Sequence, residues 1–139
     1  IAPSITGMDF ANYATAQDGY KLYAYTQGLI ALRKATNAFR LPDAYLAANF
    51  VSIAPAGAGS TVLAFGYKAV STDLTGTYYV FHNADTSPQT FTADASLAGA
   101  TLLVDGNSAG VTAIASSSTV TVSGASVTLA PLSSAVFKL

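Results

Sequence analysis

The sequence has 139 residues, of which 51% are hydrophobic and 9% are charged, and its formal net charge is −1. This length suits one folded domain with a substantial core, and disordered chains usually carry far more charge. A net charge so close to zero gives no electrostatic reason to bind nucleic acid or an anionic membrane. No apolar run approaches the length of a membrane-spanning helix.

Groups that could perform catalysis are scarce. All seven acidic residues are aspartates, and the chain has one histidine, His82, with no glutamate and no cysteine. The lack of cysteine removes disulfides, thiolate metal sites and thiol nucleophiles together. His82 is interpreted as a half-exposed structural residue, because a lone histidine at a strand end is rarely a ligand or a base. We therefore expect no catalytic residue and no bound cofactor in this chain.

One turn invites comparison with a calcium site. The run Asp105, Gly106 and Asn107 places oxygen donors close together. Calcium requires six or more oxygen ligands in a set geometry, which three turn residues cannot supply. A hairpin turn is the better interpretation, and we expect no metal site.

The chain begins with loop and continues with a helix. Residues 1–17 show no sustained periodicity and are expected to form a loop, and the absence of an initial Met or signal peptide predicts a mature, excised or truncated product. Residues 18–37 predict a helix, with Asp18 as its N-cap and basic residues in its last turn, where they favour the helix dipole. Pro42 prevents the helix from continuing.

The predicted helix has two unlike faces at about 100° per residue. One is an apolar stripe and the other is formed by small or uncharged residues; the stripe comprises Leu22, Tyr25, Thr26, Leu29 and Leu32, and the opposite face comprises Ala24, Gln27, Gly28 and Ala31. Arg33 falls within the stripe and needs an anionic or carbonyl partner, because burying a lone charge is costly. The helix could lie on a sheet of its own domain, or it could be covered on both sides with one covering body missing. We favour the second interpretation, since a solvated helix face normally carries more charge.

From Asp43 onward the pattern favours strands. β-Branched and aromatic runs alternate with turn residues at short, regular spacing. The expected strands span 50–54, 61–69, 77–84, 89–94, 100–105, 110–115, 118–123, 126–130 and 133–139. We therefore expect a mainly β fold, an antiparallel β-sandwich of about eight strands preceded by a loop and one α-helix. Alternation places Tyr79 with Phe81 on one face of their strand.

Four stretches carry a family resemblance. The stretch "YTQGLIALRKATNAFRL" (25–41) resembles the final barrel helix of starch-debranching enzymes of the α-amylase superfamily, glycoside hydrolase family 13, and of pullulanases in particular. "YYVFHNADT" (78–86) and "VTLAPLSSAVFKL" (127–139) are similar to strands of the family's C-terminal sandwich. "ITGMDFANYA" (5–14) weakly resembles the loop after the last barrel strand. The matching helix residues are Leu29, Ile30, Leu32, Arg33, Lys34, Ala38, Phe39 and Arg40.

The resemblance implies a domain division and a non-catalytic role. Residues 1–41 would be the loop and last helix of a catalytic (β/α)₈ barrel, a TIM barrel, and residues 42–139 its C-terminal β-sandwich. Such enzymes cleave α-1,6-glucosidic bonds with an Asp nucleophile, a Glu acid and a second Asp, all upstream of this sequence. The partner would be the remainder of a secreted bacterial enzyme, joined covalently or nicked. The residues expected to face the barrel are Leu22, Tyr25, Leu29, Leu32, Arg33 and Phe39.

Two alternatives to this structural role stay open. The sandwich could bind starch or pullulan weakly through exposed rings such as Tyr45 and Tyr78, although the chain has no Trp. It could instead be a surface-associated structural β domain, which would leave the helix and Arg33 unexplained. If the helix face is exposed in an isolated chain, we expect self-association.

Overall fold

The computed structural model describes residues 18–57 and 62–139, so the expected loop over 1–17 lies outside the described residues. The described part contains helices α1 (Asp18–Ala35) and α2 (Asp43–Asn49), the 3₁₀ helix η2 (Ala95–Gly99) and eight strands. The strands are β1 (Phe50–Ile53), β2 (Ala64–Val70), β3 (Thr77–Asn83), β4 (Gln89–Thr92), β5 (Thr101–Val104), β6 (Val120–Ser123), β7 (Ser126–Leu129) and β8 (Ser133–Lys138). No helix in these ranges has the length and hydrophobicity of a membrane span.

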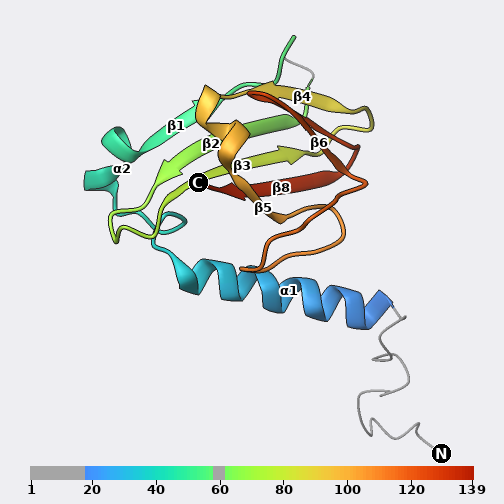
Figure 1. Cartoon of the computed structure of the whole chain (residues 1–139), viewed down its shortest axis with the longest axis horizontal. Helices are drawn as coiled ribbons and strands as arrows, with labels where there is room; N and C mark the ends of the chain where they lie inside the picture. The colour runs from blue at the N-terminus through green and yellow to red at the C-terminus, as the bar shows by residue number, and fades with distance from the viewer. Residues whose placement is uncertain (1–17, 58–61) are drawn as a thin grey trace, which may run out of the picture.

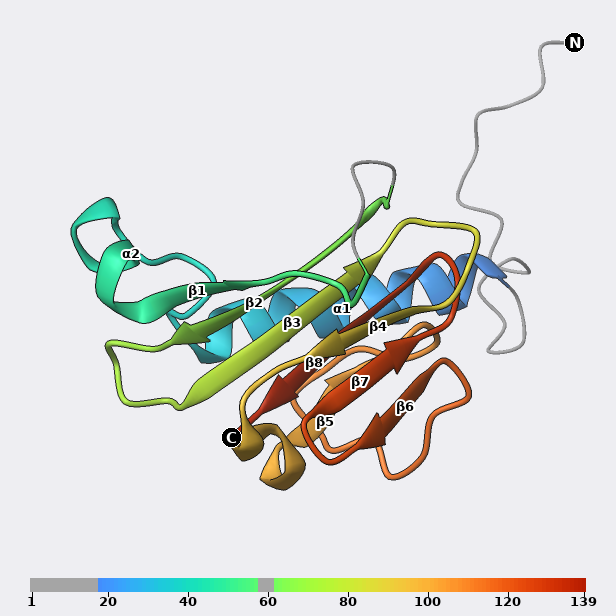
Figure 2. The same ribbon diagram turned by 90° about the horizontal axis from the view of Figure 1, so that it is seen from above.

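The strands form two antiparallel sheets. The larger has the order β1-β2-β3-β8-β5 and the smaller has the order β4-β7-β6, whose strands Figure 2 shows side by side. Their facing surfaces enclose one hydrophobic cluster, built around Phe81, Phe91 and Phe137, with Phe81 and Phe91 ring centroids 5.0 Å apart. This confirms the antiparallel β-sandwich predicted from the spacing of the strands.

Strand β3 lies between two packed layers. Tyr79 and Phe81 point into the cluster between the sheets, as the alternation predicted. Tyr78 and Val80 point to the opposite face, where they join a second cluster that includes Leu32 of α1. Because both faces of β3 are covered, the four consecutive residues from Tyr78 to Phe81 are all buried and are apolar or aromatic. His82, which follows them, is half-buried. Figure 1 shows α1 running along one side of the strands.

The end of α1 is fixed by the hairpin between β2 and β3. The helix ends at Ala35 rather than at residue 37. The Asn37 backbone N–H donates to Asp73 Oδ2 at 2.9 Å, its side-chain Nδ2 donates to Thr72 Oγ1 at 2.7 Å, and its Oδ1 accepts from the Thr72 N–H at 3.0 Å. These contacts hold the helix exit on the sheet.

Helix α2 was not anticipated by the sequence pattern. Its seven residues, "DAYLAAN", have good helix propensity, Pro42 precedes them in an extended conformation, and Asp43 lies in the first turn. None of its residues is buried, so it has no apolar periodicity that could have revealed it.

The strand expected at 110–115 is wrong. The segment runs beside β5 with two isolated hydrogen bonds, from Gly110 N to Leu103 O and from Ile114 N to Leu102 O. The pairing of β5 with β8 is irregular between Leu102 and Val104, and on the other edge of β5 only an isolated bridge forms, between Val104 and Ala109. The segment instead forms a loop that reaches α1, as Figure 1 shows.

Candidate functional site

The inward face of α1 is packed on the chain's own sheet. Leu32 is only 3% exposed and joins Val80, Leu103 and Val136 in the second hydrophobic cluster. The Tyr25 hydroxyl donates to the backbone carbonyl of Asp105 at 2.8 Å, and burial is the main cause that raises the pKa of this phenol. Both contacts bind the helix to elements far along the chain.

Gly28 allows the closest approach between α1 and the sandwich. A Cβ placed on Gly28 would lie 1.8 Å from the carbonyl oxygen of Ala109, well inside contact distance. Only glycine fits here, because the obstacle is backbone rather than a side chain that could move. The small face predicted for the helix therefore meets the sandwich at this residue.

The outward face of α1 carries apolar side chains that are largely exposed to solvent. Leu22 is 69% exposed, Ile30 and Tyr23 are each 50% exposed, and Leu29 is 41% exposed. Tyr23 accepts a hydrogen bond from Gln27 Nε2 at 2.7 Å along the same face. We call Leu22, Tyr23, Leu29 and Ile30 the outward face. Exposed apolar residues gathered on one helix are typical of an interaction surface.

The residues expected to face a barrel divide between two environments. Leu22 and Leu29 are exposed, but Tyr25 and Leu32 are committed to the chain's own sheet and Phe39 packs edge-on to Tyr78 at 5.1 Å between ring centroids. The helical residues among them lie on one stripe around the helix axis, but this stripe is wide enough to contact two bodies. Phe39 follows the end of α1. Tyr25, Leu32 and Phe39 thus hold α1 to the sandwich.

Arg33 finds its partner within the chain. Its Nη1 donates to the carbonyl oxygen of Phe39 at 3.4 Å, in the segment after α1, and the side chain is exposed. A carbonyl oxygen was one of the two expected kinds of partner for Arg33. Arg33 makes no ion pair with any residue of the described ranges. Its charge therefore remains open to an acidic partner.

A groove runs between α1 and the sheet. It has a volume of about 250 Å³, and Leu29 and Arg33 line its helix side while Tyr67 and His82 line its sheet side. His82 is half-buried, as expected; its Nδ1 lies 2.8 Å from Ser134 Oγ and its ring 4.7 Å from that of Phe65. Burial lowers the pKa of His82, which favours the neutral imidazole.

Of the two rings expected to contact sugar, one is inaccessible. Tyr78 is 1% exposed because β3 is covered on both faces, whereas Tyr45 on α2 is 50% exposed. A sugar ring stacks only on an aromatic face that solvent can reach. Tyr78 therefore cannot contact a glucan, and Tyr45 is the one of the two rings that a glucan could reach.

Asp105 is a turn residue. It is buried, its Oδ1 accepts from the N–H groups of Asn107 and Ser108, and its Oδ2 accepts from Ser117 Oγ at 2.6 Å. These donors satisfy the carboxylate without a cation, in keeping with the hairpin interpretation. Across the described ranges, no three His, Cys, Asp or Glu side chains come together as a metal site would require.

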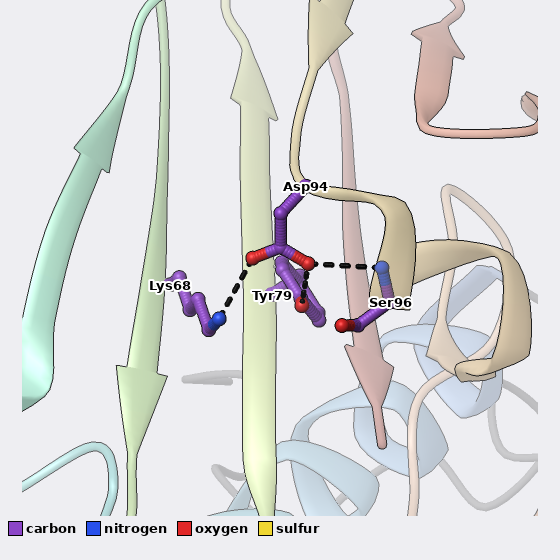
Figure 3. A network of polar contacts seen from close by, with 4 residues as sticks. All are labelled: Lys68, Tyr79, Asp94 and Ser96. Atoms are coloured by element: carbon purple, nitrogen blue, oxygen red, sulfur yellow. Dashed lines mark hydrogen bonds and ion pairs between the residues drawn. The ribbon is translucent and has the colours of Figure 1, made fainter.

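A polar network that the sequence did not reveal joins β2, β3 and η2 (Figure 3). Asp94 accepts hydrogen bonds from Lys68 Nζ at 2.7 Å, from the Tyr79 hydroxyl at 2.7 Å and from the Ser96 N–H at 3.0 Å. The Lys68 bond, followed by the Tyr79 bond, lowers the pKa of Asp94 to about 2. The partners are 26 and 15 residues away, so no local spacing could have predicted the network.

Comparisons with known proteins agree with this architecture. A family model described as SpuA C-terminal matches residues 49–139. The pullulanase SAP of Group B Streptococcus has a TM-score of 0.81 and 27% identity, over 95% of this chain and 18% of that chain. The multi-modular glycogen-degrading pneumococcal virulence factor SpuA, in a product complex, has a TM-score of 0.77 and 30% identity, over 87% of this chain and 13% of that chain.

The matched structures are several times longer than this chain. A structure of the SpuA catalytic module alone gives a TM-score of 0.77 and 29% identity, over 87% of this chain and 18% of that module. No curated protein matches in sequence. The family resemblance in the sequence is thereby confirmed: the chain belongs to the SpuA C-terminal family, as the C-terminal domain of a pullulanase-type enzyme.

Proposed function

We propose that this chain is the non-catalytic C-terminal portion of a secreted bacterial α-glucan debranching hydrolase, and that it stabilises the catalytic barrel. In this proposal residues 1–41 complete the barrel and residues 42–139 form the sandwich behind it. The observation that carries the proposal is the two-sided nature of α1. One side is fixed to the sandwich by Leu32 and Gly28, and the other exposes Leu22 and Ile30.

The composition supports a structural role over a catalytic one. The sequence has no glutamate, which the resemblance assigns as the general acid. Asp94 and Asp105 are engaged by hydrogen bonds within the chain. Cleavage of α-1,6 bonds is therefore assigned to the preceding module. Glucan binding by the sandwich is the weaker alternative, because Tyr45 is exposed and could contact a sugar but Tyr78 is buried.

The test uses the intact enzyme that carries this sequence. Leu22→Gln and Ile30→Gln replace outward apolar side chains with a good helix former. If the barrel covers them, each variant lowers the thermal midpoint of the intact enzyme by about 2 °C or more, while kcat at a temperature well below the midpoint stays unchanged. Leu32→Ala does not serve this purpose, because Leu32 is buried within the chain itself.

The matched control is Val122→Gln on β6. Val122 is 42% exposed, on the sheet farther from α1, so its replacement leaves the midpoint within experimental error. Equal midpoints for the Leu22, Ile30 and Val122 variants would contradict the proposal. A loss of kcat without a change in midpoint would contradict it too, since a stabilising element acts on the folded population and not on the chemistry.

A further inference from the structure

The face of the larger sheet that packs on α1 is only partly covered. On this face α1 contacts β3, β8 and β5 through Val80, Val136 and Leu103. The remaining strands, β1 and β2, present Phe50, Phe65 and Tyr67 on the same face, since Phe50 is paired with Ala69 and Phe65 with His82. Phe65 is 57% exposed and Phe50 is 41% exposed, whereas Tyr67 is half-buried, so the described residues cover this strip only in part.

The strip and the outward face of α1 meet at the groove between the helix and the sheet. Leu29 and Arg33 of α1 and Tyr67 and His82 of the sheet line the two walls of the same groove. Beyond the groove the strip continues to Phe65, and strand alternation extends it to Leu63, which precedes β2 and is 66% exposed. Across the strip, the rings of Phe50 and Tyr67 stack at 4.9 Å.

The dimensions of the strip suit a second packed element. The strip lies over β1 and β2, and two strand spacings correspond to a width of about 10 Å. A helix with its side chains is about 10–12 Å wide, so the two widths match. One helix or extended segment beside α1 would therefore cover Phe50, Phe65 and the groove. Aliphatic neighbours such as Leu29 and Leu63 favour a protein segment over a sugar, which would need polar donors around an aromatic ring.

The positive charge of Arg33 at the edge of the groove favours an occupant that carries an acidic group. Arg33 is exposed at its edge, with a single long bond to a carbonyl and no ion pair in the described ranges. His82 lies on the opposite wall, and burial lowers its pKa, so it adds no positive charge near neutral pH. An acidic side chain carried on an apolar segment would complement this surface.

We propose that the groove between α1 and β2 receives an apolar segment of the preceding catalytic module, carrying a carboxylate that pairs with Arg33. This inference rests on the proposed function, which supplies the occupant, and adds a second docking surface beside the outward face of α1. The length of the matched structures supports it, because this chain covers only 13% to 18% of them and the remainder provides the segment.

The experiment compares cysteine accessibility in the isolated chain and in the intact enzyme. The chain has no natural cysteine, so Phe65→Cys, Leu63→Cys and Val122→Cys each introduce one thiol into it. Labelling by a maleimide, located by peptide mass mapping, should slow at least about tenfold at residues 65 and 63 in the intact enzyme, as for a buried thiol. The thiol at residue 122 should react equally fast in both forms.

A charge variant tests the carboxylate. Arg33→Gln should lower the midpoint of the intact enzyme but not that of the isolated chain, where Arg33 is exposed. Arg33→Lys, which keeps the charge, should recover part of the loss. Equal effects of Gln and Lys would overturn the pairing, and fast labelling at residues 63 and 65 in the intact enzyme would overturn the docking surface.

The outcomes separate this inference from the proposed function. If Ile30→Gln destabilises the intact enzyme while residues 63 and 65 stay reactive, the barrel covers α1 alone and the inference fails. If Ile30→Gln has no effect either, both fail. If Phe65→Ser instead abolishes retention of the isolated chain on amylopectin, the strip is a glucan site and the inference is overturned.

Discussion

Gly28 of α1 lies so close to the backbone of Ala109 that only a residue without a side chain fits at position 28. A Cβ at Gly28 would come within 1.8 Å of the Ala109 carbonyl oxygen. The contact joins the helix to the loop after β5, far along the sequence. It fixes the helix against the sandwich and so determines which of its sides remains exposed.

Gly28→Ala therefore tests this contact, because the contact determines whether the substitution raises or lowers the free energy of unfolding. In a helix that touched nothing, this change would stabilise the chain by about 1 kcal/mol through helix propensity. Because the new methyl group meets backbone, we expect destabilisation by about 2 kcal/mol or more, measured by urea unfolding of the chain. Gln27→Ala, at an exposed neighbour, should change the free energy of unfolding by less than about 0.5 kcal/mol. A more stable Gly28→Ala protein would show that α1 is not seated as described.

The two sides of α1 should respond differently to truncation in the isolated chain. Leu32→Ala removes a side chain that is 3% exposed and should cost about 2–5 kcal/mol of unfolding free energy. Ile30→Ala removes one that is half exposed and should cost less than about 1 kcal/mol. Chemical denaturation of both variants checks this difference, and equal losses would mean that Ile30 is also covered within the chain.

The ion pair of Asp94 predicts a loss of stability in acid. Asp94 has a folded pKa of about 2, below its usual 3.8, so its contribution is present above pH 3.8 and is lost as the pH falls toward 2. The two side chains are 29% and 44% exposed, and solvent screening limits the effect to about 1 kcal/mol or less. Asp94→Asn keeps an oxygen that can accept from the Ser96 N–H, and it should flatten the stability profile between pH 4 and 2. A double-mutant cycle with Lys68→Gln should show coupling at pH 7 that disappears at pH 2.

His82 should make the chain less stable below neutral pH. Burial lowers its folded pKa below 6.5, so the unfolded chain binds the proton more readily. Stability is thus full above pH 6.5 and decreases as the pH falls through the folded pKa. Because His82 is the sole histidine, His82→Gln should remove the pH dependence just below 6.5. An unchanged profile in this variant would contradict the burial of the imidazole.

The hairpin between β2 and β3 contains a strained leucine. Leu74 has φ of 60° and is 95% exposed, so its side chain gains little from packing while its backbone is in the left-handed region. Leu74→Gly should stabilise the chain by about 1 kcal/mol. Leu74→Ala keeps the Cβ and should give no such gain. Thermal unfolding of the two variants distinguishes backbone strain from the removal of an exposed apolar group.

The sequence predicted those elements whose signals are local. The helix predicted over 18–37 had an apolar stripe and the strand predicted over 77–84 had an apolar and aromatic run. The structure confirms both elements, with α1 over Asp18–Ala35 and β3 over Thr77–Asn83. Helix α2 buries nothing and therefore has no such pattern. The segment 110–115 has strand-like composition, but it makes only two backbone hydrogen bonds to β5, and only the tertiary structure determines this pairing.

The candidate site could be predicted only in part. The position of Leu22 and Leu32 on one stripe follows from helix geometry, but the stripe does not say that Leu32 meets the sheet while Leu22 is exposed. The Asp94 network and the groove beside Arg33 bring together residues that are distant in the chain. Such contacts depend on strand order, which neither periodicity nor turn residues specify.

The most direct test of the proposed role measures whether the preceding module covers the outward face of α1. Ile30→Cys introduces a thiol at a position that is half exposed in this chain, and Val122→Cys provides the control on β6. We expect maleimide labelling of residue 30 to be fast in the isolated chain and at least about tenfold slower in the intact enzyme, with residue 122 fast in both. Equal labelling rates at residue 30 in the two forms would contradict the packing of α1 between the sandwich and the catalytic barrel.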